Sequence, residues 1–233
     1  MLEKIKKGFS FTLVFAMLLT SILGIAFAAE GGTPDLPFTD VENHWGYDAI
    51  HFVYEHGIMQ GTSGTTFSPD QECSRAMMVA TLFRLHRGRM ANDSDPVDHP
   101  FTDVTGWATP YVAWAFDSGV VMGMSETIFA PDVHVSRQEA TVMLYRFASF
   151  TWANTYSPPY QSDRFPDGHL IGSWAEGAIN WAVYHELIRG IAGNLEPRST
   201  INRTQVATLL ERFVELFTLC PELAERIKLR NII

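Results

Sequence analysis

An internal repeat limits the folds open to this chain of 233 residues more than any other feature of its sequence. Five landmarks recur in one fixed order: a Phe-x-Asp motif, a tryptophan, a glycine sixteen residues after the tryptophan, a proline-ended loop, and a polar residue followed by arginine. Three recurrences in the same order predict three copies of one structural unit. The landmarks are Phe38, Trp45, Gly61, Pro69 and Ser74-Arg75; Phe101, Trp107, Gly123, Pro131 and Ser136-Arg137; and Phe165, Trp174, Gly190, Pro197 and Asn202-Arg203.

Segments rich in turn-forming residues separate the copies. Glycine, proline, asparagine and aspartate are concentrated in residues 88–100, and prolines and polar residues in residues 151–164. Such residues favour loops over regular structure. The repeats are therefore predicted over residues 36–88, 99–150 and 163–217, with a tail over residues 218–233.

Each unit is predicted to be a helix, a loop and a second helix. Apolar residues at helical spacing place the first helices at about 45–56, 108–118 and 174–187. The second helices are predicted at about 74–87, at 136–150 and from Asn202 onward, after favourable N-cap residues. Neither helix of a unit can bury its apolar face alone, so the chain is predicted to be all-α, with three units sharing one core.

The helix ends are predicted to differ between the copies. Gly57 and Gly119 can end the first helices in the left-handed conformation, whereas Glu186 occupies that position in the third copy, so its helix should end differently. At the starts of the second helices, Glu139 and Gln205 fit a capping box, and Met77 leaves the first copy without one.

The N-terminal residues are predicted to be a cleaved signal peptide over 1–28, followed by a linker over 29–35. Three lysines precede an apolar run, and Ala26-Phe27-Ala28 has the small-x-small pattern of a cleavage site. The alternative is a retained membrane anchor, because the run approaches the length of a membrane span. Hydroxyl residues within the run favour cleavage.

The charge argues against nucleic acid as the main partner. The chain has 17 basic and 26 acidic residues, and removal of residues 1–28 takes away three lysines and one glutamate. The remaining 14 basic and 25 acidic residues give a net charge of −11, whereas binding to phosphate backbones requires a basic surface. Cys73 and Cys220 are too few for a disulfide scaffold or a four-cysteine zinc site, and a bond between them is left open.

The repeated arginine carries the clearest functional implication. Arg75, Arg137 and Arg203 occupy the first position of each second helix, where the helix dipole mildly disfavours a cation. A guanidinium beside free helix N–H groups is a good receptor for a carboxylate or a phosphate. An internal ion pair with a repeated aspartate explains the same residues equally well, so both interpretations stand. The repeated aspartates are Asp40, Asp103 and Asp167.

The other repeated residues fit structural roles more readily than binding roles. Trp45, Trp107 and Trp174 suggest stacking on sugars, but a tryptophan at the start of a helix more often belongs to the core. One aspartate per copy is more typical of a turn or an N-cap than of a metal site. The repeated glycines fit a positive φ or a close backbone approach. No metal or cofactor is predicted, because the eight histidines share no repeated position.

Taken in order, the landmarks resemble the S-layer homology (SLH) family of bacterial surface proteins, whose unit begins with Phe-x-Asp-Val and whose second helix begins with Thr-Arg-Ala-Glu. The resemblance covers about residues 36–217. It implies one pseudo-threefold domain with a central helical bundle. It also implies non-catalytic binding of cell-wall glycan, typically a secondary wall polymer with pyruvate ketals. In the family this arginine binds ligand in grooves between repeats, which implies that role for Arg75, Arg137 and Arg203.

The copies depart from the family pattern to different degrees. The acidic position of the helix-start motif survives only as Glu139, and the third copy has Gly168 and Leu195 in place of the family's valine and phenylalanine. The groove of the third copy is therefore the most altered, and Arg137 and Arg75 rank above Arg203. The candidate groove residues are the three repeated arginines, tryptophans and glycines, supported by the three aspartates, Glu139 and Gln205.

The predicted function is a secreted, non-catalytic protein of the cell wall or surface layer, held by wall polysaccharide and free of the membrane after signal cleavage. The alternative is a self-assembling or adaptor protein whose repeats contact other protein chains and do not need the arginines. A glycan hydrolase would require two carboxylates about 5–10 Å apart in a cleft. The sequence singles out no such pair.

Overall fold

The computed structural model describes residues 36–88, 90–92, 94–151 and 155–218. The predicted signal peptide and linker, the tail beyond residue 218 and Cys220 lie outside these residues. The described part of the chain is helical apart from turns and isolated bridges, which confirms the prediction of an all-α fold. None of its helices is both long enough and apolar enough to cross a membrane.

First and second helices alternate along the chain, as the repeats predict. The first helices are α2 (Tyr47–Glu55), α4 (Thr109–Asp117) and α6 (Glu176–Tyr184), which begin one or two residues later than predicted. The second helices are α3 (Arg75–Arg87), α5 (Arg137–Thr151) and α7 (Arg203–Thr218). The short 3₁₀ helices are η1 (Gly106–Ala108), η2 (Gln161–Arg164) and η3 (Gly168–Leu170).

The end of α6 contradicts the expectation that the third copy closes its helix differently. Glu186 has a φ of 57°, close to the 65° of Gly57 and the 71° of Gly119. The left-handed conformation costs a residue other than glycine about 1–2 kcal/mol. The backbone N–H of Leu187 donates to the carbonyl oxygen of Ala182 at 2.8 Å. This bond ties off the end of the helix and helps to offset the strain of Glu186.

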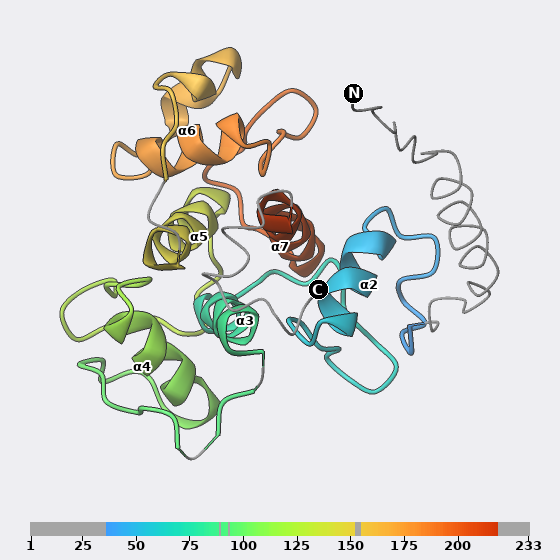
Figure 1. Ribbon diagram of the computed structural model, residues 1–233, viewed down its shortest axis with the longest axis vertical. Helices are drawn as coiled ribbons and strands as arrows, with labels where there is room; N and C mark the ends of the chain where they lie inside the picture. The colour runs from blue at the N-terminus through green and yellow to red at the C-terminus, as the bar shows by residue number, and fades with distance from the viewer. Residues whose placement is uncertain (1–35, 89, 93, 152–154, 219–233) are drawn as a thin grey trace, which may run out of the picture. The chain divides into compact units, whose positions relative to one another are not determined.

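The three second helices form the centre of the domain and the first helices surround them (Figure 1). Each first helix packs against the second helix of a neighbouring repeat: α4 against α3, α6 against α5, and α2 against α7. The last of these contacts joins the first repeat to the third and closes the set into a ring. The described residues from Pro37 onward belong to one compact unit, as the shared core predicts.

Aromatic side chains from different repeats meet between the helices. Phe147 of α5 and Phe213 of α7 have ring centroids 5.8 Å apart, and Trp181 of α6 lies 6.3 Å from Phe213. All three side chains are fully buried. Burial of one large apolar side chain contributes about 1.5–3 kcal/mol, so separating the repeats would expose much of what stabilises each of them.

The predicted caps begin the second helices. The Ser136 backbone N–H donates to Glu139 Oε2 at 2.8 Å, and the Glu139 N–H donates to Ser136 Oγ at 3.3 Å, which completes the capping box. Asn202 and Gln205 form the same reciprocal pair in the third copy. In the first copy Ser74 caps α3 without a reciprocal side-chain partner, as expected from Met77 at the position of Glu139 and Gln205.

Cys73 lies immediately before the N-cap of α3 and is buried. Burial raises the pKa of its thiol to about 12, so the thiol is protonated at neutral pH. The bond to Cys220 that the sequence left open involves a residue outside the described part of the chain.

Candidate functional site

Each repeated aspartate holds a loop of its own repeat just before the second helix. The Asp103 carboxylate accepts hydrogen bonds from the backbone N–H groups of Phe129 at 2.9 Å and Ala130 at 2.7 Å. Asp40 and Asp167 hold their loops in the same way. The aspartates therefore make turns, and no group of metal-binding side chains occurs in the described residues. The second donor has a positive φ in every copy: 58° at Ser68, 60° at Ala130 and 50° at Glu196.

Acid is expected to release these loop contacts. Burial alone would raise the pKa of each aspartate, but the loop N–H groups outweigh burial and hold the pKa below its ordinary value. A pKa lowered by folding adds stability above the unfolded pKa of about 3.9, and this stability is lost as pH falls through the folded value. In urea denaturation we expect the free energy of unfolding to decrease from about pH 5 to pH 2, and to decrease less in Asp103→Asn. If the free energy of unfolding fell equally with pH in Asp103→Asn and in the parent chain, the contacts of Asp103 with its loop would not cause the loss of stability in acid.

Each repeated arginine reaches from its own repeat to the loop of the next. Arg75 Nε donates to the carbonyl oxygen of Phe129 at 2.8 Å. The side chains are nearly enclosed, with exposed fractions of 5% for Arg75, 8% for Arg137 and 7% for Arg203. The third contact closes the ring, because it joins the third repeat to the first. The equivalent bonds are both 2.9 Å long and join Arg137 to Leu195 and Arg203 to Phe67.

The ion pair of Arg75 is formed with Glu139 rather than with a repeated aspartate. Arg75 Nη1 lies 3.6 Å from Glu139 Oε1, while the Asp103 oxygens bind their own loop. Burial lowers the pKa of Arg75, and the charges of Glu139 and Asp103 oppose that effect. The guanidinium also lies over the Phe129 ring, 4.8 Å from its centroid, which adds a cation–π contact.

The N–H groups at the starts of the second helices are not free, contrary to the hypothesis of a helix-end anion receptor. The N–H of Arg75 donates to Val133 and that of Ala76 to Pro131, both carbonyl oxygens lying 2.9 Å away in the next repeat. The N-cap side chain binds the third N–H. Helices α5 and α7 use their first N–H groups in the same way. An anion in this region must therefore be bound by side chains.

The repeated glycines allow close packing of the loop on the first phenylalanine of the repeat. At Gly123 φ is 81°, and an added Cβ would overlap the Phe101 ring and lie 2.6 Å from the carbonyl oxygen of Ser125. Gly190 has a φ of 83° and the same surroundings, whereas Gly61 shows the close approach alone. The sequence predicts a positive φ or a close approach at these glycines; two of the three positions show both, and Gly61 shows the close approach.

The repeated tryptophans lie at the surface, so their predicted place in the core is wrong. The exposed fractions are 65% for Trp45, 56% for Trp107 and 58% for Trp174. Trp45 precedes the first residue of α2, and Ile50 and Val53 supply the buried side of that helix instead. The tryptophans are thus available to a ligand.

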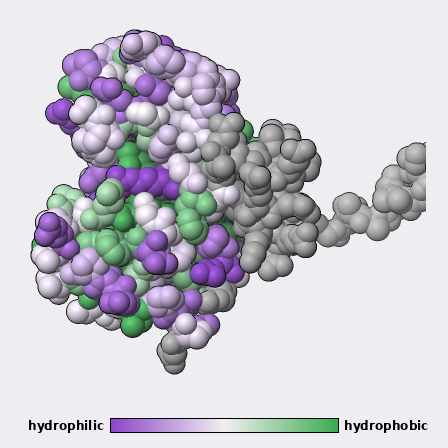
Figure 2. Space-filling model, turned by 60° about the vertical axis from the view of Figure 1, so that its left-hand side comes forward, coloured by the Kyte–Doolittle hydropathy of each residue, from purple (hydrophilic) through white to green (hydrophobic). Residues whose placement is uncertain are grey.

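Two grooves bring candidate residues from three repeats together. One groove, of about 330 Å³, is lined by Trp45 of the first repeat, Arg137 of the second, and the loop and α7 of the third. The other, of about 350 Å³, is lined by Trp174 of the third repeat, Arg75 of the first, and the loop and α5 of the second. Figure 2 shows the face that carries α4, α5 and α6, where strongly hydrophilic residues lie in a recess beside hydrophobic ones.

This pairing changes which arginine belongs to which loop. The sequence ranking assumed that an arginine and a loop of the same copy form one groove, whereas the loop of the third repeat lies with Arg137. Gly190 and Gln205 line that groove, and Gly123 and Glu139 line the other. Arg203 is the third repeated arginine, and its Nη2 donates to the carbonyl oxygen of Gln60 at 2.6 Å. This bond helps to hold the first repeat.

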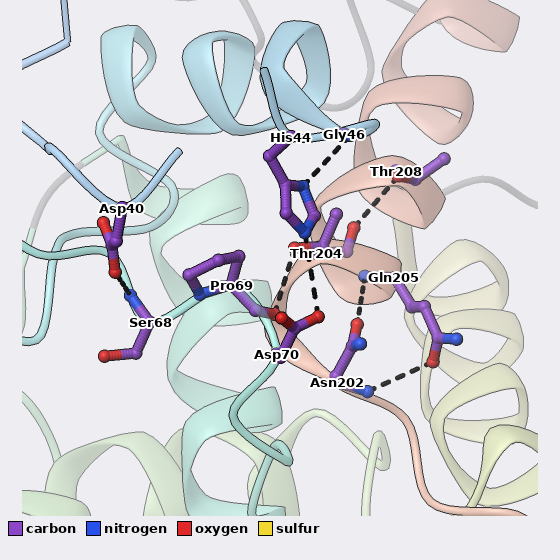
Figure 3. A network of polar contacts seen from close by, with 10 residues as sticks. All are labelled: Asp40, His44, Gly46, Ser68, Pro69, Asp70, Asn202, Thr204, Gln205 and Thr208. Atoms are coloured by element: carbon purple, nitrogen blue, oxygen red, sulfur yellow. Dashed lines mark hydrogen bonds and ion pairs between the residues drawn. The ribbon is translucent and has the colours of Figure 1, made fainter. Parts of the chain in front are cut away.

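Trp45 directly follows His44, which belongs to a polar network between the first repeat and α7 (Figure 3). His44 accepts a hydrogen bond at Nδ1 from the Gly46 N–H at 3.2 Å, and His44 Nε2 lies 3.7 Å from Asp70. Thr204 of α7 donates to the carbonyl oxygen of Pro69 at 3.0 Å in the same network. The Thr204 bond therefore holds the loop of the first repeat against α7.

A second repeated arginine was missed by the sequence analysis. It follows the first by nine residues in every copy, and that spacing could have revealed it. Arg212 lines the groove of Arg137, and Arg146 lines the groove of Arg75. Burial lowers the pKa of both residues. The second arginines are Arg84, Arg146 and Arg212.

Several bacterial proteins are similar to this chain over most of its length. The endoglucanase of Bacillus sp. (strain KSM-635) is 28% identical over 213 residues, which are 90% of this chain and 22% of the relative. The S-layer protein sap of Bacillus anthracis is 24% identical over 208 residues, 89% of this chain and 24% of the relative. The cellulosome-anchoring protein of Acetivibrio thermocellus is 22% identical over 180 residues, which are 76% of this chain and 37% of the relative. The chain thus spans less than two fifths of each of these relatives.

The family of the chain follows from three separate matches. The S-layer homology domain matches residues 37–77, 100–141 and 164–207. Each match begins one residue before the Phe-x-Asp motif of one repeat and ends inside its second helix, and together the matches cover more than half of the chain. The chain belongs to the S-layer homology family.

Proposed function

We propose that this chain is a non-catalytic protein of the cell surface that binds wall glycan in the grooves between its repeats. Its family and its relatives, which include a surface-layer protein and a cellulosome-anchoring protein, support a location at the cell surface. The observation that carries the proposal is the exposed tryptophan that faces a groove together with a buried arginine. The indole offers an apolar face to a sugar ring, and the guanidinium offers charged donors to a carboxylate.

A pyruvate ketal on the wall polymer fits this pair of groups. The ketal places a carboxylate directly on a sugar ring, so one sugar residue can contact both the tryptophan and the arginine. The helix N–H groups take no part, because the loops of the next repeat already occupy them. The carboxylate is therefore bound by guanidinium groups, which favour planar, two-point recognition of this anion.

The acidic composition does not prevent binding of an anionic polymer. The whole chain has a formal charge of −9, but charges are screened over about 8 Å at physiological salt. Two arginines from different repeats line each groove at much shorter range. The local field inside the groove therefore outweighs the distant surface charge.

The use of the repeated aspartates supports a non-catalytic role. Asp40, Asp103 and Asp167 each bind two loop N–H groups of their own repeat. Glycoside hydrolysis uses two carboxylates on either side of one scissile bond. The repeated aspartates do not provide that arrangement, because each is committed to a separate loop.

The tryptophans allow a test that leaves the fold intact. Replacement of Trp45, Trp107 and Trp174 by alanine removes exposed side chains, so little stability should be lost. We expect the affinity of the full chain for isolated bacterial walls, measured by co-sedimentation, to fall at least tenfold. Tyr160→Ala, which removes an exposed aromatic outside both grooves, should leave binding unchanged. Undiminished wall binding by the triple variant would refute the groove mechanism, and concentration-dependent oligomers would then favour assembly with other protein chains.

A further inference from the structure

Two methionines in the lining of the groove of Arg75 are open to solvent. The exposed fractions are 68% for Met122 and 60% for Met124, and both residues line the groove. Met143 of α5 belongs to the same lining but is only 4% exposed. A peroxide can attack a methionine sulfur only where solvent reaches it, so Met122 and Met124 differ in reactivity from their buried neighbour.

Backbone hydrogen bonds hold the loop that carries these two methionines. The Val121 N–H donates to the carbonyl oxygen of Ala115 at 3.0 Å, and the Met124 N–H donates to that of Ile128 at 2.7 Å. Val121 is buried, and an added Cβ at Gly123 would have no room. The inner side of the loop is therefore filled, and the two methionines that flank Gly123 stay on its exposed side.

Trp174 of the third repeat adds a third exposed apolar side chain to this groove. A Cβ added to Gly172 would lie 2.5 Å from Trp174 Nε1, so the indole lies directly over this glycine. The Gly172 N–H donates to Gln138 Oε1 of α5 at 3.0 Å, which ties this segment to the second repeat. The tryptophan and the methionines thus belong to one apolar lining that can pack against a sugar ring.

Oxidation would change both the polarity and the hydrogen bonding of this lining. Hydrogen peroxide oxidises a thioether by two electrons: the sulfur takes one peroxide oxygen, the O–O bond breaks, and the other oxygen leaves with both protons as water. The product is a polar sulfoxide whose oxygen accepts hydrogen bonds. Arg75 and Arg146 line the same groove, and guanidinium groups only donate. A sulfoxide here offers these arginines an internal acceptor that competes with a ligand.

The other groove lacks this sensitivity. Arg189 and Ile191 flank the repeated glycine of the third copy, at the positions of Met122 and Met124, and both line the groove of Arg137. No sulfur-containing side chain occurs among the described residues that line that groove. Peroxide is therefore expected to act on one groove and spare the other.

We propose that Met122 and Met124 are sites of oxidation by hydrogen peroxide, and that their sulfoxides block ligand binding in the groove of Arg75 while the groove of Arg137 continues to bind. The proposal rests on the proposed function, because it concerns the regulation of one of the same sites. Sulfoxides are reduced back to thioethers by methionine sulfoxide reductases, so the loss of binding is reversible.

Peptide mass spectrometry of the full chain after peroxide treatment tests the modification itself. We expect Met122 and Met124 to be oxidised about tenfold faster than Met59 and Met78, which are at most 1% exposed. Circular dichroism before and after treatment checks that the helices remain. Equal rates of oxidation at the exposed and the buried methionines would overturn the proposal.

Wall binding is then measured in two variants that each keep the tryptophan of one groove. Trp45→Ala keeps that of the groove with the methionines, and Trp174→Ala keeps that of the groove of Arg137. Peroxide should weaken co-sedimentation with walls about tenfold in Trp45→Ala and less than about twofold in Trp174→Ala. Further exchange of Met122 and Met124 for leucine in the Trp45→Ala chain keeps an apolar lining without sulfur, so peroxide should no longer change its binding. Reductase treatment should restore binding in the Trp45→Ala chain.

The outcomes separate this inference from the proposed function. Sulfoxides at both methionines with unchanged binding by the Trp45→Ala chain would overturn the inference and leave the proposed function standing. An equal peroxide effect in the leucine variant or in Trp174→Ala would also overturn it, because another oxidised residue would then be responsible. A Trp45→Ala chain that fails to bind before treatment, while the parent binds, would overturn it as well. A parent chain that binds no walls before treatment would overturn both proposals.

Discussion

Replacement of Gly123 by alanine is expected to lower the free energy of unfolding by about 2–5 kcal/mol. Its φ of 81° costs an alanine about 1–2 kcal/mol, and the added Cβ has no room. The Phe101 ring and the carbonyl oxygens of Ser125 and Ile128 surround that position, the latter at 2.6 and 2.9 Å. Backbone atoms cannot move aside as the end of a flexible side chain can, so the loop must shift as a whole.

Two other glycines provide matched controls for Gly123. Gly119 has a φ of 71° with nothing within 4 Å of an added Cβ, so Gly119→Ala should show the cost of the backbone conformation alone. Gly177 lies in α6 with open space around it, and Gly177→Ala should stabilise the chain by about 0.5–1 kcal/mol. Urea denaturation of the three variants measures these differences. A loss in Gly123→Ala no greater than that in Gly119→Ala would show that the packing argument is wrong.

Replacement of Arg203 by alanine is expected to cost about 2–4 kcal/mol, because this residue closes the ring between the third and first repeats. Its Nε donates to Phe67 at 2.9 Å and its Nη2 to Gln60 at 2.6 Å, and the guanidinium lies 4.4 Å from the centroid of the Phe67 ring. The substitution leaves the buried Phe67 carbonyl oxygen without this donor. A buried polar group that loses its partner costs about 1–3 kcal/mol.

Arg137→Ala is the comparison for Arg203→Ala. Arg137 donates to the carbonyl oxygen of Leu195, and a leucine has no aromatic ring for the guanidinium to cover. Replacement of Arg137 should therefore cost less free energy of unfolding than replacement of Arg203. Thermal and urea denaturation of the full chain should rank Arg203→Ala as the more damaging change. An equal or greater loss in Arg137→Ala would contradict the closing role of Arg203. Because both arginines stabilise the fold, alanine variants of them are poor probes of binding, and the exposed tryptophans serve that purpose better.

The repeats, the helices and their caps could be predicted because each depends on neighbours in the sequence. Ser136 and Glu139, for example, are three residues apart and form the expected capping box. The grooves could not be predicted in this way, because each one joins residues of three repeats. Arg137 and Trp45 come together only through the packing of α2 on α7, which no local pattern reveals. The exposed position of the tryptophans has the same origin.

The second repeated arginine could have been predicted from the sequence. Nine residues of an α-helix correspond to about two and a half turns, so two residues at this spacing lie on opposite sides of the helix. Arg137 and Arg146 of α5 accordingly line different grooves. The same nine-residue spacing in all three copies places the second arginine on the opposite side of each central helix.

Wall binding before and after removal of pyruvate ketals tests the central claim most directly. The full chain would be mixed with isolated bacterial walls, and with the same walls after mild acid treatment that hydrolyses the ketals and leaves the polymer attached. The two-arginine grooves require the ketal carboxylate, so we expect the bound fraction to fall and the dissociation constant to rise at least tenfold after treatment. Equal binding to both preparations would contradict the account, because the grooves would then not bind the carboxylate for which their arginines are arranged.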